Sequence, residues 1–513
     1  MPIRTIIILA LAALSQPAVS QEAATSASPQ ILFNQGKFQD AAAAYQTIIE
    51  KDKSSGPTYA GLVRSLLKLD DVSAAEQESQ KALDALPQSS LVHAVRGDVY
   101  FRRGLFDLAE REYKSALVME DKCAHAVLGL ARVYAAESRL NKARELFAKA
   151  HELDPEDGDA LYYWALTLPY PNNAEALDKH LANFRDDLER ERREREFLEL
   201  IKALAGRPVW VPARDVDHTE MKLETMLGPP TRSGTQPQPL NPGPTMVPRG
   251  LGLRVKLNET TVRTMLLDTG ASGVVIKKAL ADKIGARRVS DQALEGIGSG
   301  GAVTGYTAWV DKIIIGDLEF HDCIVRVSLK NNLGDADGLI GADVFDHYLV
   351  TIDFPNHKLV LNPLPKISEP RDAAETNATQ SAQSFTRVFT FGHLLLMPTR
   401  VGGNANGLFF IDSGANSNLI SPALAGQVGK ARDSGITVQG VSGQVNDVRS
   451  VAGAVLNFAN YNQPAEDLLT VDLHPQSKEL GTEVSGIVGY STLRKMKIVI
   501  NYRDGLVLIP RTE

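Results

Sequence analysis

The chain has 513 residues, and at roughly 100–200 residues per domain this length suggests about three or four domains. Its formal charge of −7 at pH 7 disfavours a nucleic-acid partner, because phosphate binding favours a clustered basic excess. With 43% hydrophobic and 23% charged residues, the composition is that of a soluble globular protein.

The N-terminus has the pattern of a secretory signal peptide. Arg4 supplies a positive charge, residues 6–14 form an apolar stretch, and residues 18–20 are small side chains before Gln21. The apolar stretch is too short to span a bilayer, and no second stretch of spanning length follows. We therefore expect cleavage after residue 20, export to the periplasm or cell envelope of a bacterium or beyond it, and no membrane span in the mature chain. An N-terminal anchor that is not cleaved is the alternative.

The cysteine and histidine content predicts neither a disulfide framework nor a metal site. Cys123 and Cys323 lie in different regions of the chain, so we expect both to be buried apolar side chains. The ten His residues show no HExxH or CxxC-type spacing. We expect no metal and no other cofactor.

The first half of the chain repeats itself every 34 residues between residue 31 and about residue 160. The recurring phases hold Ala41, Ala75, Ala109 and Ala143; Phe38, Val72, Phe106 and Leu140; Ile48, Ala82, Ala116 and Ala150; and Tyr45, Tyr113 and Phe147, with Ser79 as the exception. This period, with small residues where paired helices cross, resembles the tetratricopeptide repeat. The resemblance implies a stacked solenoid with the Ala and aromatic positions in its core. It also implies a concave face that binds a peptide or protein partner, with a pure spacer role as the alternative.

Two polar segments follow the repeats. Residues 186–196 alternate acidic and basic side chains, which predicts a solvated helical face that caps the solenoid rather than a binding site. Residues 206–248 are rich in Pro, Gly, Thr and Gln, and this composition predicts an extended linker.

The second half of the chain carries one order of motifs twice, in short alternating strands with Gly-rich turns that predict all-β structure. The run Leu-Leu-Asp-Thr-Gly-Ala at 266–271 has its counterpart Phe-Ile-Asp-Ser-Gly-Ala 144 residues later, at 410–415. A Gly-containing turn follows each run, and then an apolar-apolar-Gly sequence that ends at Gly341 or Gly489. A strand, a turn and a last strand close each half.

This order of motifs resembles the retropepsin-like and pepsin-like aspartic proteases over residues 249–364 and 386–511. The resemblance implies that Asp268 and Asp412 meet between two lobes, where two adjacent carboxylates cannot both ionise cheaply. One carboxylate would take a proton from a water, and the other would polarise the scissile carbonyl. Gly270 and Gly414 would allow the close approach of the backbone. Thr269 and Ser413 would bond across the interface, with a local turn bond as the alternative.

The Gly-rich hairpin resembles a retropepsin flap that closes over substrate, and an exposed hairpin without function is the alternative. We assign to the flaps and the substrate cleft Gly296, Ile297, Gly298, Ser299, Gly300, Gly440 and Val441. The second hairpin differs from the first, which leaves open whether one flap or two cover the cleft. Ala271 and Ala415 stand where pepsins usually carry Ser, so the carboxylates lose a hydrogen bond, and we expect activity in mildly acidic to near-neutral conditions.

The sequence thus predicts a multidomain chain in which an all-α tetratricopeptide solenoid precedes an all-β bilobal aspartic-protease fold. The expected units are a signal peptide (1–20), helical repeats with capping helices (31–205), a linker (206–248), lobe 1 (249–364), an interlobe linker (365–385) and lobe 2 (386–511). The expected function is that of an exported endopeptidase whose solenoid recruits substrate or partner proteins, and a single chain would suffice for catalysis. A non-catalytic peptide-binding or assembly protein is the main alternative. A zymogen activated by removal of the front end is a further one, and a fragment from Val247 would test it.

Overall fold

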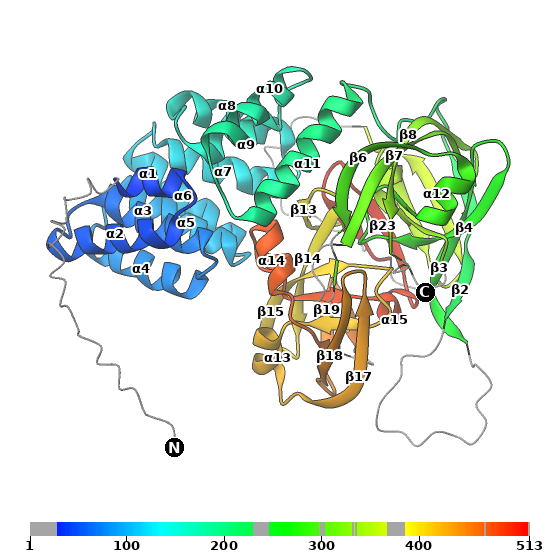
Figure 1. Cartoon of the computed structure of the whole chain (residues 1–513). Helices are drawn as coiled ribbons and strands as arrows, with labels where there is room; N and C mark the ends of the chain where they lie inside the picture. Colours follow the sequence, from blue (N-terminus) through cyan, green and yellow to red (C-terminus); the bar gives the residue numbers. More distant parts are fainter. Residues whose placement is uncertain are drawn as a thin grey trace, which may run out of the picture.

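A computed structural model describes residues 28–228, 246–294, 296–297, 303–330, 333, 336–366, 385–465 and 468–510. A helical region leads into two β lobes, and the lobe 2 strands β13 and β14 lie next to the solenoid (Figure 1). The predicted fold class is confirmed in both parts. The predicted signal peptide lies outside the described residues, as does most of the predicted interlobe linker.

The helical region consists of paired antiparallel helices with short turns. Its elements are α1 (Pro29–Asn34), α2 (Phe38–Lys51), α3 (Gly56–Lys68), α4 (Val72–Ala85), α5 (Ser90–Arg102), α6 (Phe106–Met119), α7 (Ala124–Ala136), α8 (Leu140–Leu153), α9 (Gly158–Ala165), α10 (Asn172–Asn183) and α11 (Leu188–Leu204). Among the residues that the structure describes, no helix is long and apolar enough to cross a bilayer.

The Ala and aromatic positions of the repeat lie in the core of the solenoid, as predicted. Their packing is tight: a Cβ on Gly129 would lie 2.1 Å from the ring of Tyr113, whose hydroxyl donates to Asp98 at 2.7 Å. Two aliphatic positions of the same phases are exposed instead, Ile48 at 39% and Leu140 at 54%. The 34-residue period therefore identifies the inward face of each helix. Whether a large aliphatic side chain in one of these phases is buried depends on which side chain of the neighbouring repeat lies opposite it.

The charged run at 186–196 is not the solvated face that we expected. Asp186 forms an ion pair with Lys68 of α3 at 2.7 Å, and Glu194 is only 4% exposed. Arg190 donates to Glu194 at 2.9 Å, and His180 lies 3.3 Å from the same carboxylate. The prediction was wrong because the alternation gives each acidic side chain a basic partner, and charges that are paired and hydrogen-bonded in this way can be buried against a neighbouring helix.

The two lobes share one arrangement of strands around their Asp loops. In lobe 1 the sheet runs in the order β2-β3-β4-β9-β5-β8-β7-β6, and in lobe 2 in the order β17-β18-β21-β16-β22-β15-β14-β19-β20, with β13 paired to β14. The bounds in lobe 1 are β2 (Glu224–Gly228), β3 (Val247–Leu257), β4 (Thr261–Asp268), β5 (Val274–Lys277), β6 (Arg287–Leu294), β7 (Val303–Ile315), β8 (Leu318–Ser328) and β9 (Gly338–Gly341), with helices α12 (Lys278–Ile284) and η1 (Ala342–Phe345).

The corresponding bounds in lobe 2 are β13 (Phe389–Phe391), β14 (Leu394–Val401), β15 (Ala405–Ile411), β16 (Asn418–Ile420), β17 (Arg432–Gly440), β18 (Gly443–Ser450), β19 (Val455–Phe458), β20 (Tyr461–Pro464), β21 (Leu468–Thr470) and β22 (Gly486–Val488), with helices α13 (Pro422–Val428), α14 (His474–Leu480) and α15 (Tyr490–Leu493). In each lobe a short apolar strand, β9 or β22, lies between the strand before the Asp loop and the strand after it. The Asp loops are therefore held on both sides by backbone hydrogen bonds.

A third sheet joins the lobes in the order β1-β11-β10-β23-β24-β12. Its strands are β1 (Thr219–Lys222), β10 (Tyr348–Asp353), β11 (Lys358–Pro363), β12 (Thr386–Arg387), β23 (Lys497–Asn501) and β24 (Leu506–Leu508). The strand–turn–strand ends of both halves, which the sequence predicts, meet here through the antiparallel pairing of β10 with β23.

Part of the expected linker is folded. Within residues 206–248, β1 extends the interlobe sheet at β11, and β2 pairs with β3 at the edge of the lobe 1 sheet. The Pro-rich residues 229–245 lie outside the described residues. A fragment that begins at Val247 would therefore lose two strands, so it does not separate an activation step from simple unfolding.

The solenoid packs directly on lobe 2 through aromatic rings. Phe106 of α6 lies 4.3 Å from Phe389 and 6.1 Å from Phe391, measured between ring centroids. The buried hydroxyl of Thr482 donates to the carbonyl of Phe101 at 2.9 Å. Because Phe106 is only 2% exposed, this contact belongs to a continuous core rather than to a loose domain contact.

Candidate active site

Two equivalent loops bring Asp268 and Asp412 together between the lobes. Asp268 ends β4, whose last residues pair in parallel with β9, and Asp412 follows β15, which pairs in parallel with β22. Each carboxylate accepts the amide hydrogen of the Gly two residues later, at 2.9 Å in both loops. Both Asp side chains are half-buried, and they are close enough to share a hydrogen bond.

The two loops are tied to each other by reciprocal hydrogen bonds across the interface. The hydroxyl of Thr269 donates to the carbonyl of Ile411 at 2.7 Å and accepts from the amide of Ser413 at 2.9 Å. The hydroxyl of Ser413 donates to the carbonyl of Leu267 at 2.8 Å and accepts from the amide of Thr269 at 3.1 Å. All four bonds are buried, and each joins a side-chain hydroxyl to a backbone group of the other loop. They hold the two loop backbones at a fixed separation, and with them the two carboxylates.

Thr269→Val should therefore destabilise the protein by roughly 2 to 4 kcal/mol, because it leaves one buried carbonyl and one buried amide without a partner. Thr269→Ser is the matched control, since it keeps the hydroxyl and reproduces the residue of the second loop. Urea unfolding measures both variants. Equal stability of the Val and Ser variants would contradict a role for the hydroxyl.

Gly270 and Gly414 are required by the close approach of the loops. A Cβ on Gly414 would lie 2.4 Å from Cγ of Asp268, and a Cβ on Gly270 would lie 2.7 Å from Cγ of Asp412. Neither distance is possible for a real side chain. Each Gly thus lets one loop face the carboxylate of the other loop directly.

The two carboxylates are not electrostatically equivalent. Burial and the neighbouring charge of Asp412 hold the pKa of Asp268 well above its ordinary value. Burial also raises the pKa of Asp412, but the amides of Ala415 and Gly414, both at 2.9 Å, stabilise its anion. Both pKa values are raised, that of Asp268 further, so the pair holds one proton that the two carboxylates share.

Both hairpins that we assigned to the cleft reach the partner lobe. The amide of Ser442, beside Val441 in the β17–β18 turn, donates to the carbonyl of Ile297 at 3.0 Å. A Cβ on Gly440 would lie 1.9 Å from the same carbonyl oxygen, and one on Gly296 would lie 2.9 Å from Cβ of Val441. Gly298, Ser299 and Gly300 lie outside the described residues. The described parts of the two hairpins, one from each lobe, thus contact each other.

Three further side chains hold the Asp loops, and our sequence analysis missed them. Asp343 accepts from the hydroxyl of Ser272 at 2.8 Å and from the amide of Gly273 at 2.9 Å. His393 Nε2 lies 3.2 Å from the carbonyl of Gly270, and burial lowers the pKa of this imidazole. On the other side Arg249 bonds to the side chain of Asn416.

The sequence contains a signal that could have identified two of these residues, Arg249 and His393. Arg249 and His393 each precede the Asp of their own lobe by the same number of residues, and each contacts the Asp loop of the other lobe. An alignment of the sequences of the two halves at the 144-residue offset matches Arg249 with His393. Within the described part of the chain, no group of three or more His, Cys, Asp or Glu side chains is placed to hold a metal ion.

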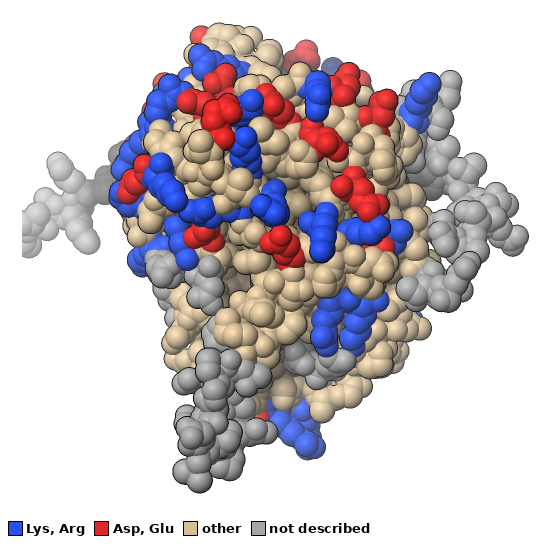
Figure 2. Space-filling model, turned by 90° about the vertical axis from the view of Figure 1, so that its right-hand side faces the viewer, with Lys and Arg blue, Asp and Glu red and all other residues tan. Residues whose placement is uncertain are grey.

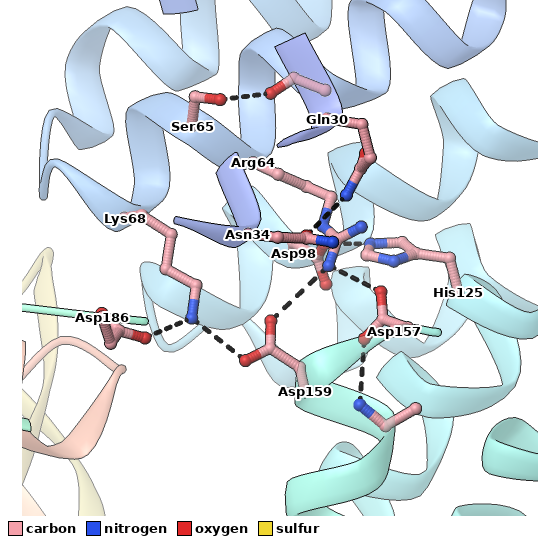
Figure 3. Close-up of polar contacts among 12 residues, drawn as sticks. Gln30, Asn34, Arg64, Ser65, Lys68, Asp98, His125, Asp157, Asp159 and Asp186 are labelled. Atoms are coloured by element: carbon pink, nitrogen blue, oxygen red, sulfur yellow. Dashed lines mark hydrogen bonds and ion pairs between the residues drawn. The ribbon is translucent and has the colours of Figure 1, made fainter. Parts of the chain in front are cut away.

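The inner face of the solenoid is a second candidate site. Arg64 of α3 pairs with Asp157 at 2.7 Å, and Lys68 pairs with Asp159 at 3.0 Å and with Asp186 (Figure 3). These pairs connect the first repeats to α9 and to the residues before α11, beside a cavity of about 330 Å³. On the opposite side of the molecule, at the β lobes, acidic and basic side chains intermingle over the upper part of the face shown in Figure 2.

Comparison with known proteins agrees with this division of the chain. The sequence model of an aspartyl protease family matches residues 253–344, and models of the tetratricopeptide repeat match residues 32–99 and 95–158. No curated protein matches the chain.

Several solved structures are similar to parts of the chain. An aspartic proteinase from Irpex lacteus is 12% identical over 58% of this chain and 98% of its own, with a TM-score of 0.37. The APC/C Cut9–Hcn1 hetero-tetramer gives 20% identity over 34% of each chain and a TM-score of 0.30. MamA gives 19% identity over 29% of this chain and 89% of its own, with a TM-score of 0.21. Together with the strand order and the paired Asp loops, the family matches identify a chain in which tetratricopeptide repeats precede an aspartic protease-like domain.

Proposed function

We propose that the chain is an aspartic-type endopeptidase that hydrolyses peptide bonds with water activated by Asp268 and Asp412. The juxtaposition of these two carboxylates, in loops cross-bonded through Thr269 and Ser413, carries the proposal. Asp412 takes a proton from the attacking water, while protonated Asp268 donates its proton to the scissile carbonyl oxygen. Asp412 then gives its proton to the amide nitrogen of the gem-diol, the C–N bond breaks, and Asp268 takes a proton from one of the gem-diol hydroxyls. The dyad thereby returns to its singly protonated state without a covalent intermediate.

We further propose that the protein is exported to the periplasm or cell envelope and that the solenoid recruits the substrate or a partner protein. The signal-peptide pattern of residues 1–20 supports export. The tetratricopeptide repeats support a protein partner, because stacked repeats present an extended curved surface.

A peptide-binding protein without catalysis is the second candidate. One observation favours it: the turns of the two hairpins bond to each other through Ser442 and Ile297, and Val441 and Ala271 pack against the same apolar cluster, which gives an apolar surface for a peptide beside the Asp loop of lobe 1. A protein of that kind would keep its peptide affinity after both Asp residues are replaced, whereas an enzyme would lose its turnover.

Cleavage of a mixed peptide library tests the proposal. Full-length protein produced with its N-terminal segment should begin at Gln21 after export, and this product is assayed from pH 3 to 8. The control is the double variant Asp268→Asn/Asp412→Asn with the same circular dichroism spectrum. We expect cleavage that is greatest in mildly acidic to near-neutral solution and absent from the control. Binding without cleavage at every pH would reject the enzyme in favour of the peptide-binding protein.

A further inference from the structure

One charged side chain of the lobe 1 sheet points to the same face as the residues that flank Asp268. Arg326 lies in β8 and pairs in parallel register with Val275 of β5. Its neighbours Val325 and Val327 are fully buried in the main core of the β lobes. Because successive residues of a strand point to opposite faces of the sheet, Arg326 points away from that core.

The face to which Arg326 points carries the flanks of the lobe 1 Asp loop. Val275 belongs to a small apolar cluster on this face. Leu266 and Ala271, which lie on either side of Asp268, pack against the same cluster. Neighbouring strands lie about 4.8 Å apart, so the side chain of Arg326 stands directly beside that of Val275. The guanidinium is therefore a cation at the border of an apolar surface beside this Asp loop.

The charge of Arg326 acts at the same loop. His393 Nε2 lies 3.2 Å from the carbonyl of Gly270. Burial lowers the pKa of His393, and the positive charge of Arg326 lowers it further, against the opposing effect of Asp343. A guanidinium whose charge acts on this imidazole is close enough to act on a peptide bound at the Asp loop.

Arg326 has no partner of its own in the described part of the chain. Its guanidinium makes no hydrogen bond and no ion pair there, although it is half-buried. Burial lowers its pKa, and the charge of Asp343 offsets part of this effect. The carboxylate of Asp343 is itself engaged by the hydroxyl of Ser272 and the amide of Gly273. A carboxylate from a bound peptide would give the guanidinium a partner through charge-assisted, bidentate hydrogen bonds.

The equivalent position in lobe 2 is apolar. Counted from the Asp of each lobe, Leu419 is the counterpart of Val275. Leu419 pairs in parallel with Leu469, which is therefore the counterpart of Arg326. Leu469 is only 2% exposed and lies in the apolar cluster that lobe 2 shares with the solenoid. The two lobes thus differ at equivalent positions, where one is cationic and the other is apolar.

We propose that Arg326 is a specificity-determining residue that binds an acidic side chain, Asp or Glu, of a peptide on the lobe 1 side of the cleft. This inference rests on the proposed peptidase function and names the substrate class of the same site. Because Leu469 offers no charge, no preference for an acidic side chain is expected on the lobe 2 side.

Pairs of peptides that differ only by Glu or Gln at one position test the proposal. The two side chains have the same shape, and both peptide ends are blocked, so the side-chain carboxylate is the only difference. The Glu or Gln is moved through successive positions of a sequence that the wild type cleaves. We expect kcat/KM in near-neutral solution to favour Glu by about tenfold at one position, the size of one charge-assisted hydrogen bond.

Three variants of the full chain assign this preference to the guanidinium. Arg326→Leu reproduces the residue of lobe 2 and should lower the Glu/Gln ratio to about one. Arg326→Lys keeps the positive charge without the planar fork and should retain part of the ratio. Arg254→Leu, at an exposed Arg on β3 of the same lobe, removes the same charge elsewhere and should leave the ratio unchanged.

The outcomes separate this proposal from the proposed function. A ratio near one at every position for the wild type, or an unchanged ratio in Arg326→Leu, would overturn the acidic preference. Equal losses for the Glu and Gln peptides in Arg326→Leu would mean that Arg326 only stabilises the lobe, which also overturns it. If the wild type cleaves nothing, the enzyme proposal fails. The affinities of Glu and Gln library peptides for Asp268→Asn/Asp412→Asn, with and without Arg326→Leu, then decide whether Arg326 binds the carboxylate.

Discussion

Asp268→Asn and Asp412→Asn should each lower the rate of peptide cleavage by roughly 10⁴-fold, because each removes one partner of a shared proton. Their effects on stability should differ. The folded state raises the pKa of both carboxyls, and that of Asp268 further, so in each case the neutral Asn mimics the form that the fold favours. We therefore expect both variants to retain or raise Tm near pH 7, and Asp268→Asn to raise it more.

The pH dependence of stability follows from the same asymmetry. The folded-state pKa of Asp268 lies above its unfolded value of about 4. The stability that this group contributes is complete below the unfolded pKa and is lost as pH rises through the folded pKa, because the native state binds more protons. Thermal unfolding from pH 3 to 8 should show Asp268→Asn gaining on the wild type as pH increases. A constant difference between the two proteins would contradict a raised folded-state pKa of Asp268.

Phe106→Ala should cost about 3 to 5 kcal/mol of the free energy of unfolding, the range for truncating a large buried aromatic side chain. The ring fills space between α6 and the lobe 2 strand β13, so the substitution leaves a cavity shared by the solenoid and the lobe. Urea unfolding followed by circular dichroism measures the loss. Phe197→Ala, at a side chain that is 41% exposed, is the control and should change stability by about 0.5 kcal/mol or less.

A double-mutant cycle with Phe389→Ala isolates the contact between the solenoid and lobe 2. We expect a coupling of about 0.5 to 1.5 kcal/mol between the two rings, as for other aromatic pairs. Strictly additive losses would mean that Phe106 stabilises the repeats alone, and that the solenoid is energetically separate from lobe 2.

Local patterns in the sequence were sufficient to predict both fold types and the position of the dyad. The 34-residue period predicts small and aromatic core positions because each repeat packs on an equivalent neighbour. The two Asp loops are recognisable because their Gly residues and apolar flanks recur at a fixed offset. The sequence also predicts that Cys123 and Cys323 are buried, and the structure confirms this.

Contacts between distant segments could not be predicted in this way. β1 and β2 are short strands that are stabilised by pairing with the edges of existing sheets. Because this pairing is not visible in the local sequence, the surrounding Pro and Gly residues led to the prediction of a linker. Glu196 lies in a run of alternating charges in which no single carboxylate stands out, and only the structure shows that it accepts the amide hydrogen of Ala293 in β6. In the sequence Phe389 and Phe391 have the pattern of ordinary strand residues, and only the structure shows that they contact Phe106 of α6.

The pairing of β10 with β23 makes the two lobes interdependent folding units. β10 pairs locally with β11 and β23 with β24, but the contact between these two hairpins forms only when residues separated by about half of the β region have met. This pairing therefore carries a high loop-closure entropy and forms late. Expressed alone, either lobe would expose an apolar strand edge that is able to pair with another copy of itself. The duplicated halves, although alike in sequence pattern, are therefore expected to unfold in one cooperative transition and to aggregate when separated.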